Sequence, residues 1–332
     1  MHSRQEPGWS VMGTGTIATE HMVAAIRSAG HHPLWVVSRN RHYATDFSQD
    51  MQIPGIAVDA RRSLRDPRIG FAYVSAVRDR RKHYILAAAA EHKHVLCDGP
   101  IAGTSRMAAT LVEACKAAGI ILALNQPFRT MAPHRTMRRL AQDGEIGTVQ
   151  SLLIARGAPY QPPPNRHLDE RADRSDALFE LAVDSVDLAR FVTGQEPATV
   201  TALSAAPPGT EADQSSYAIG MSGGAIFQCY ESFTTAEFES IVMLAGDRGT
   251  LIAHGTLSGK GSGTLVRRLN GRNELIPVRD RDPHVTTIEA FLALPQTPAT
   301  WMSLGDDNVI ALRTAEAVSA AQKKRPVAVG GQ

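Results

Sequence analysis

A glycine-rich turn near the start of the chain has the residue types of a dinucleotide phosphate site. It comprises Gly13, Thr14, Gly15, Thr16 and Ile17, and it stands between a short apolar run and a helix-like segment. Glycine lets backbone amides approach a pyrophosphate, and the positive end of the following helix points at the same place. The same string also occurs in ordinary surface turns. The surrounding sequence therefore has to decide whether a nucleotide binds here.

The next apolar run, residues 34–37, ends in Ser38, Arg39, Asn40 and Arg41. NAD-binding folds commonly carry Asp or Glu here, which accepts a hydrogen bond from the ribose 2′-hydroxyl. In this chain a hydroxyl and a guanidinium could instead bind a 2′-phosphate. We therefore expect NADP(H) as cofactor, with NADPH preferred over NADH. The alternative is an exposed polar loop that binds nothing.

Strand-like and helix-like stretches alternate over residues 9–125. The pattern predicts strands over 9–12, 34–37, 56–58, 70–75, 94–97 and 120–125, with helices over 17–29, 82–91 and 105–118. This alternation predicts an α/β fold with a doubly wound, parallel Rossmann sheet, whose ligands bind at the carboxyl ends of the strands. Further cofactor contacts are accordingly expected at Ala76, Arg78, Asp98, Gly99, Pro100 and Asn125.

The pattern changes after Pro127. Helices over 134–142 and 176–192, a strand over 149–155 and short strands between 198 and 278 predict an α+β domain with an open, mainly antiparallel sheet. We expect a Rossmann domain over 1–126 and a second domain over 127–332, whose last helix, 306–321, could pack back towards the first. Arg129 lies where the chain leaves the Rossmann domain. It could contact the cofactor or form a surface salt bridge.

Composition excludes several classes of protein. The 332 residues are 43% apolar and 20% charged with a net charge of +2, which is typical of a soluble globular protein and not of a nucleic-acid binder. No apolar run is long enough to span a membrane. Three widely spaced cysteines predict neither a disulfide framework nor a zinc site, and no other metal site is expected. The expected location is the cytoplasm.

Five segments, in order, resemble the Gfo/Idh/MocA oxidoreductases, the family of glucose-fructose oxidoreductase and inositol dehydrogenase. They are the glycine-rich turn, residues 91–100, 143–149, 178–194 and 306–327. The resemblance implies a Rossmann domain followed by an open sheet that forms the substrate face and much of a homodimer or homotetramer interface. It also implies hydride transfer between NAD(P) and a small molecule, usually a sugar or polyol.

The sequence departs from that family at its reacting groups. The family's Glu-Lys-Pro corresponds here to Asp98, Gly99 and Pro100, so the usual lysine is absent. Its helical Asp, His and Asp correspond to Glu180, Asp184 and Asp187, so the histidine is absent as well. Ala76, Val77 and Arg78 replace the usual Thr-Pro-Asn.

The three helical carboxylates share one face, because they are four and three residues apart. In a pocket they could not all stay ionised, and one would titrate high. Glu180 and Asp187 could equally cap, form salt bridges or face solvent. An ordinary Asp is protonated only about once in a thousand at pH 7, so it is a poor proton donor to a ketone. A carboxylate instead suits iminium reduction, where it stabilises a cation, or alcohol oxidation, where it is a base.

Other candidate proton donors are Tyr160 and His83. Tyr160 and His167 flank a proline-rich loop and could enter the pocket, whereas for His83 a partly exposed helical histidine is the favoured interpretation. Cys97 is expected to be a buried, unreactive thiol. The leading hypothesis is an NADP(H)-dependent reductase or dehydrogenase whose substrate bears an amine or imine, or is otherwise not a simple sugar. The alternatives are an inactive cofactor-binding scaffold or sensor, and a redox-neutral enzyme for elimination or cyclisation.

Overall fold

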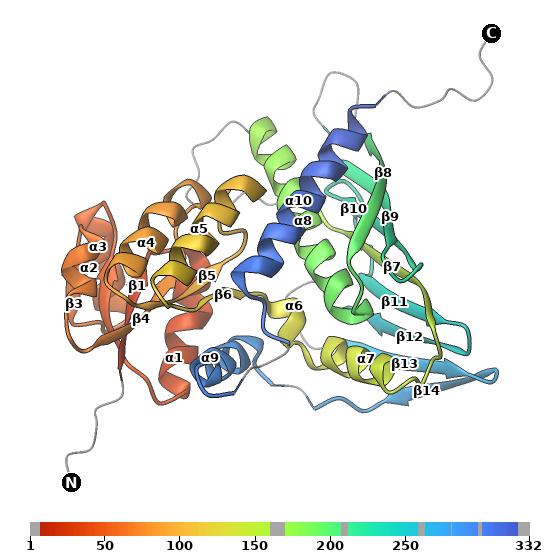
Figure 1. Ribbon diagram of the computed structural model, residues 1–332, viewed down its shortest axis with the longest axis horizontal. Helices are drawn as coiled ribbons and strands as arrows, with labels where there is room; N and C mark the ends of the chain where they lie inside the picture. Colours follow the sequence, from red (N-terminus) through yellow and green to blue (C-terminus); the bar gives the residue numbers. More distant parts are fainter. Residues whose placement is uncertain are drawn as a thin grey trace. The chain divides into compact units, whose positions relative to one another are not determined.

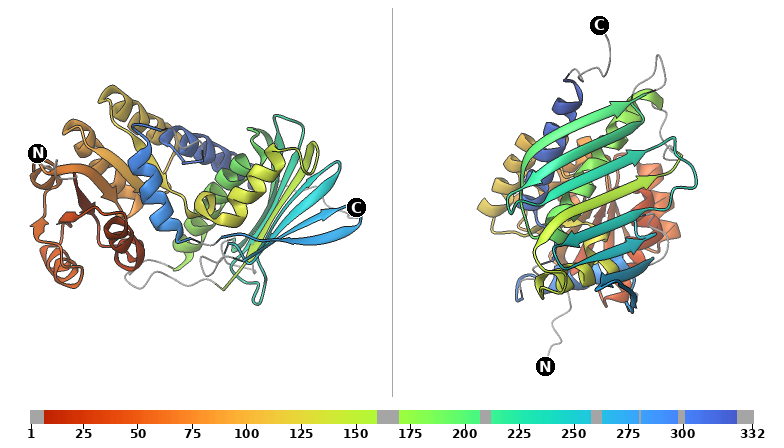
Figure 2. Two further views of the ribbon diagram at one scale, coloured as in Figure 1. Left: turned by 90° about the horizontal axis from the view of Figure 1, so that it is seen from below. Right: turned by 90° about the vertical axis from the view of Figure 1, so that its right-hand side faces the viewer.

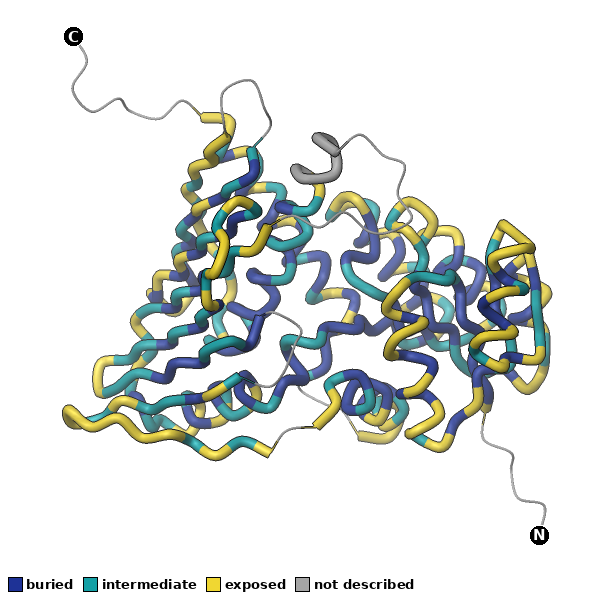
Figure 3. The backbone as a smooth tube through the Cα atoms, turned by 180° about the vertical axis from the view of Figure 1, so that it is seen from behind, coloured by how far each residue is buried: buried dark blue, intermediate teal, exposed yellow. Residues whose placement is uncertain are grey.

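The computed structural model describes residues 7–159, 170–206, 212–257, 263–279, 281–297 and 301–324, with the backbone alone for 170–175. The chain divides into two compact units. Residues 1–130 and 281–310 form the first, and residues 131–280 and 311–332 form the second. In the first unit, the strands and the helix faces turned towards them are largely buried, while the outer turns are exposed (Figure 3). In the second unit, the central strands contain buried residues, whereas the strands over residues 197–205 and 272–276 contain none.

The first unit contains a six-stranded parallel sheet in the order β3-β2-β1-β4-β5-β6 (Figure 1). The strands are β1 (Gly8–Met12), β2 (Pro33–Val37), β3 (Gly55–Ala57), β4 (Ile69–Val74), β5 (His94–Asp98) and β6 (Leu122–Asn125). Apolar side chains such as Val11, Val36 and Leu96 are fully buried, because helices cover both faces of a parallel sheet. The predicted doubly wound sheet is confirmed.

The crossovers of this sheet are helical. They are η1 (Ala18–Met22), α1 (Val23–Ser28), α2 (Arg41–Asp50), α3 (Ala60–Leu64), α4 (Arg78–Ala90) and α5 (Ser105–Ala117), and α6 (Pro127–Thr130) follows β6. Two predicted helices needed correction. The helix expected over 17–29 opens with a turn of π-helix, and α4 begins at Arg78 instead of Lys82. The first turn of α4 is entirely charged, so it carries no apolar periodicity for the sequence to reveal.

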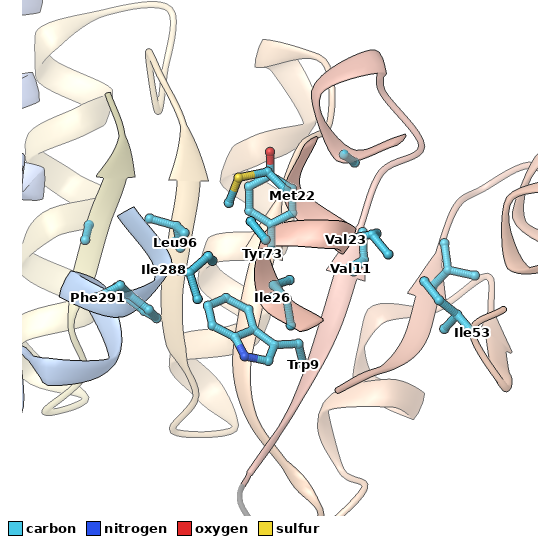
Figure 4. Close-up of a cluster of buried hydrophobic side chains, with 14 of the residues drawn as sticks. Trp9, Val11, Met22, Val23, Ile26, Ile53, Tyr73, Leu96, Ile288 and Phe291 are labelled. Carbon is cyan, nitrogen blue, oxygen red and sulfur yellow. The ribbon is translucent and has the colours of Figure 1, made fainter. Parts of the chain in front are cut away.

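Helix α9 (Pro283–Ala293), far along the chain, completes the core of the first unit. Its Phe291 ring lies 5.5 Å from Trp9 and 5.9 Å from Phe71, and Ile288 is fully buried beside them (Figure 4). This apolar face explains why residues 281–310 belong to the first unit. The division therefore differs from the expected one, in which everything after residue 126 formed the second domain.

The second unit contains an eight-stranded sheet in the order β14-β13-β12-β11-β7-β10-β9-β8 (Figure 2). The strands are β7 (Val149–Gly157), β8 (Pro197–Ala205), β9 (Gln214–Met221), β10 (Ile226–Ser232), β11 (Ile241–Gly246), β12 (Gly249–His254), β13 (Thr264–Leu269) and β14 (Arg272–Ile276). Among the described strands of this sheet only β7 and β10 pair in parallel, so the expected mainly antiparallel sheet is confirmed. Helices α7 (Ala132–Gln142) and α8 (Glu170–Thr193) pack on it. Helix α10 (Gly305–Gln322) is divided between the units, with residues up to 310 in the first and residues from 311 in the second.

Candidate active site

The glycine-rich turn is pressed against the end of β4. Gly13 has φ +107°, and a Cβ there would lie 2.7 Å from backbone atoms of Ser75 and Ala76. Its amide donates to the Val37 carbonyl at 2.9 Å, and the Ser75 amide donates to Met12 at 2.9 Å. A Cβ on Gly15 would lie 3.0 Å from the Ser75 carbonyl oxygen. Glycine is therefore required for this close approach, which a Rossmann phosphate turn also needs.

The residues after the glycines lead into a widened helical turn. Thr14 is half-buried, Thr16 is exposed, and Ile17 exposes 39% of its surface although it is a large apolar residue. The hydroxyl and the amide of Thr19 both bond to the Gly15 carbonyl at 3.1 Å. The π-turn η1 follows at once, and such turns recur at functional sites. The exposed Ile17 thus lies beside the turn, where an apolar ring of a ligand could cover it.

The end of β2 carries the residues expected to select the cofactor. Ser38 is half-buried and its amide donates to the Ala57 carbonyl at 3.2 Å, whereas Arg39 is exposed. Burial raises the pKa of Tyr84, while the charges of Arg39 and Arg80 act in the opposite direction. The guanidinium groups of Arg39 and Arg80 therefore both lie near Tyr84. The sequence had indicated only Arg39 as a cofactor contact.

The carboxyl ends of β4, β5 and β6 are joined through Asp98. One of its carboxylate oxygens accepts from Tyr73 Oη at 2.8 Å and from Asn125 Nδ2 at 3.0 Å. Burial and the Asp98 charge raise the pKa of Tyr73 well above its ordinary value, so the phenol stays a neutral donor. Asn125 Oδ1 and Gln126 Nε2 are buried without a hydrogen-bond partner among the described residues. These two atoms, an acceptor and a donor, match the groups of a carboxamide.

Arg81, which the sequence did not single out, links the neighbouring strand ends. Its Nε donates to the Ala76 carbonyl at 2.9 Å and its Nη1 to the Pro100 carbonyl at 2.6 Å. A Cβ on the adjacent Gly99 would lie 3.0 Å from Gln126 Nε2. That contact is with the end of a flexible side chain, so a lysine at position 99 would require Gln126 to move.

The remaining candidates of the first unit lie in different surroundings. Arg129 is 4% exposed and its Nη2 lies 3.4 Å from Asp307 Oδ1, which matches the salt-bridge alternative in a buried setting. His83 is exposed on α4, in a surface groove that it shares with Asp79 and Lys82. Cys97 is fully buried, and burial raises the pKa of its thiol to about 12, as expected for an unreactive side chain. Tyr160 and His167 lie outside the described residues.

In the second unit the three carboxylates lie on α8. Glu180 and Asp184 are half-buried and Asp187 is 2% exposed. Below them, Arg156 of β7 donates to Glu231 Oε1 at 3.0 Å, to the Leu181 carbonyl at 2.6 Å and to Ser185 Oγ at 3.2 Å. Burial disfavours the charge of Arg156, but Glu231 and Asp184 raise its pKa overall. The positive charge of the Arg156 guanidinium thus lies beside the carboxylate-rich face of α8.

The described parts of the chain contain neither a cluster of metal ligands nor a membrane-spanning helix. No three His, Cys, Asp or Glu side chains there are arranged to hold a metal ion. Nor is any described helix long and apolar enough to cross a membrane.

A Rossmann sheet with a glycine-rich turn, followed by a large mixed sheet, defines a two-domain NAD(P)-binding oxidoreductase. The family comparisons agree: residues 8–126 match the model "Oxidoreductase family, NAD-binding Rossmann fold", and residues 134–252 match the "GFO/IDH/MocA C-terminal domain". This chain belongs to the Gfo/Idh/MocA oxidoreductase family.

Proteins of similar sequence or fold include solved structures that hold different dinucleotides. The 1,5-anhydro-D-fructose reductase of Ensifer adhaerens is 30% identical over 319 residues, covering 93% of this chain and 94% of that protein. An Agrobacterium radiobacter oxidoreductase in complex with NAD⁺, L-tartaric acid and magnesium has a TM-score of 0.79 at 18% identity, covering 96% of each chain. A 3-ketoreductase of Actinomadura kijaniata in complex with TDP-benzene and NADP has a TM-score of 0.77 at 18% identity, covering 96% of this chain and 98% of that one. The fold therefore admits both dinucleotides.

Proposed function

We propose that this chain is an NADP(H)-dependent oxidoreductase for a small molecule. The cofactor preference rests on the residues at the end of β2. There Ser38 and the exposed Arg39 occupy the place of the usual carboxylate, and the charge of Arg80 is nearby. Residues 13–17 would hold the pyrophosphate, and Ser38 with Arg39 the 2′-phosphate. The bound dinucleotide would supply or accept a hydride at its nicotinamide ring.

Replacing Arg39 with alanine is expected to weaken NADPH binding about ten- to a hundredfold, because a charge-assisted contact to the 2′-phosphate is lost. NADH binding should change less than about twofold, since NADH lacks that phosphate. Isothermal calorimetry with both nucleotides measures these affinities. Arg41→Ala, two residues further on in the exposed first turn of α2, is the matched control. Parent protein that binds NADPH no more tightly than NADH would contradict the proposal.

We further propose that carboxylates take over where relatives carry lysine and histidine. Gly99 leaves the lysine position without a side chain, and Asp184 stands at the histidine position beside Arg156. A carboxylate stabilises an iminium or accepts a proton from an alcohol, but it donates poorly to a ketone. The preferred substrate class is therefore an amine- or imine-bearing compound. The compound named for the Ensifer relative, 1,5-anhydro-D-fructose, is the carbonyl substrate to compare with it.

Asp184→Asn is expected to lower turnover at least about a hundredfold, because a positioned acid–base group typically contributes that much. The measurement is NADPH oxidation with a cyclic imine and with 1,5-anhydro-D-fructose, from about pH 6 to about pH 9. Asp176→Asn, an exposed carboxylate on the same helix, is the control. If Asp184→Asn is as fast as the parent throughout this range, Asp184 has no such role. NADPH binding without turnover of either compound would favour a cofactor-binding scaffold or sensor.

We also propose that the chain forms a homodimer or homotetramer through the sheet of the second unit. Helices α7 and α8 pack on one face, and exposed apolar side chains of that sheet include Leu203 and Ile226. Exposed apolar groups on a large sheet are typical of subunit interfaces. Light scattering after size exclusion should give at least twice the monomer mass, and Leu203→Lys with Ile226→Lys should shift it towards the monomer. A monomeric parent protein would refute this assembly.

A further inference from the structure

Two histidines from distant parts of the chain stack against each other in the first unit. His21 lies on η1, directly after the glycine-rich turn, and His284 lies in the first turn of α9. Their ring centroids are 4.7 Å apart and the planes differ by 12°. Neither ring has a role in the nucleotide contacts derived above.

The direction of α9 places this pair at the ligand-binding edge of the sheet. The far end of the helix, at Leu292, shares a surface groove with Pro7 and Gly70, which lie at the amino ends of β1 and β4. The opposite end of α9, where His284 lies, consequently points to the carboxyl edge. In agreement, the charge of Asp98, the last residue of β5, acts on His284.

His284 is an enclosed side chain with an unused nitrogen. It is 8% exposed, and its Nδ1 is buried without a hydrogen-bond partner among the described residues. Burial lowers the pKa of His284 and the nearby His21 lowers it further, whereas Asp282 and Asp98 oppose these effects. His21, by contrast, has a side chain that is 43% exposed, with Glu20 at 3.9 Å.

Other charged groups on the helices that pack against α9 are engaged elsewhere. Arg129 of α6 pairs with Asp307, and Arg27 of α1 donates to the carbonyls of Met51 and Gln52. The charged groups that act on the pair are therefore Asp282 and Asp98 at His284 and Glu20 at His21. Two stacked imidazoles disfavour double protonation, so the pair holds at most one proton readily.

We propose that His21 and His284 form a coupled histidine pair at the reacting centre, in which His284 is the proton donor, on the side of the site where the family lysine is missing. The proposal rests on the proposed oxidoreductase function. When the bound dinucleotide supplies a hydride to the substrate carbon, the C–O π pair would become an oxygen lone pair, and that oxygen would take a proton from His284 Nε2. His284 would regain a proton from solvent, and the charge of the stacked His21 would set how readily that proton is held. Oxidation moves the same proton in the opposite direction.

An imidazole suits this task better than the nearby carboxylates. The pKa of an ordinary imidazole lies about 2.6 units above that of an ordinary Asp carboxyl, and the lowering of the His284 pKa by burial and His21 reduces that advantage. Proton transfer is most efficient when the pKa of the group lies near the working pH. The pair would therefore extend the substrate class of this site from imines, which need no proton donor, to ketones, and the turnover assay with a cyclic imine and 1,5-anhydro-D-fructose distinguishes the two cases.

The first experiment titrates the histidine side-chain resonances of the cofactor-free chain by NMR, in the parent protein and in His21→Phe. Phenylalanine keeps a ring against His284 but removes the neighbouring charge, so the pKa of His284 should rise. His92→Gln, at the amino edge of the sheet where His92 Nδ1 bonds to Ala118, is the control and should leave His284 unchanged. An unchanged titration of His284 in His21→Phe would overturn the coupling.

The second experiment measures proton release on nucleotide binding by calorimetry in buffers of different ionisation enthalpy, at about pH 6 where imidazole titrates. The cationic ring of NADP⁺ should expel a proton from the pair, so NADP⁺ should release more protons than NADPH. This difference should be lost in His284→Phe and retained in His92→Gln. If His284→Phe does not fold, His21→Phe, whose side chain is partly exposed, should reduce the difference.

The outcomes separate the two proposals. Binding of both nucleotides with equal proton release in the parent protein would overturn the histidine pair and leave the oxidoreductase function standing. Absence of binding heat for either nucleotide would overturn the proposed function and the pair with it.

Discussion

Gly13→Ala is expected to abolish measurable NADPH binding, raising the dissociation constant by at least about a hundredfold. The added methyl group would lie 2.7 Å from Ser75 and Ala76 backbone atoms, and φ is +107°. Backbone at the end of a central strand cannot yield as a flexible side chain can, so the turn itself must move away from the phosphate position. Calorimetry gives the affinity, and circular dichroism during heating gives the thermal midpoint of the same variant.

The control for this change is Gly30→Ala. Gly30 also has a positive φ, +81°, but a Cβ there meets nothing within 4 Å. The variant should lose only about 1–2 kcal/mol of stability from the left-handed backbone and should bind NADPH normally. Undiminished NADPH binding by a folded Gly13→Ala protein would show that the turn does not form the phosphate site.

Arg156→Met is expected to destabilise the protein by about 3–5 kcal/mol. The Glu231 side chain is completely buried, and Arg156 supplies its counter-ion at 3.0 Å from the next strand. Without the guanidinium, the carboxylate remains in the interior uncompensated, and the Leu181 carbonyl also loses the hydrogen bond from Arg156. Urea denaturation followed by circular dichroism measures the loss.

Two further variants test whether the loss of stability in Arg156→Met comes from the unpaired charge of Glu231. Arg156→Met with Glu231→Leu removes both charges and should be more stable than Arg156→Met alone, because no unpaired ion is left. Arg139→Met removes an exposed pair with Asp143 and should cost less than about 1 kcal/mol. A loss in Arg156→Met no larger than that of Arg139→Met would mean that the buried pair does not stabilise the fold.

The prediction of family and fold from the sequence was confirmed, because both depend on local patterns. Alternating apolar runs and glycine stops specify strands and helices one after another, and the parallel sheet follows from the crossovers between them. The site residues stay predictions. For Arg129 the sequence left two alternatives open, a cofactor contact and a salt bridge. The buried contact with Asp307 agrees with the salt bridge.

Other features depended on residues far apart in the sequence. Arg156 and Glu231 are 75 residues apart, yet they are register partners on β7 and β10. Helix α9 returns to the first unit because Phe291 fits against Trp9 and Phe71. The apolar periodicity of β7, β10 or α9 does not predict which surface of the protein that element will cover. The same return brings His284 against His21, and no local motif marks that pair.

The sequence by itself thus determined the Rossmann fold, the glycine-rich turn and the carboxylate and glycine residues at the positions where the family resemblance implies histidine and lysine, since backbone freedom and residue identity are properties of single positions and their neighbours. Only the tertiary structure decided which side chains surround the altered site. Burial, stacking and ion pairing there arise between residues that chain folding brings together, and their energies depend on that enclosure.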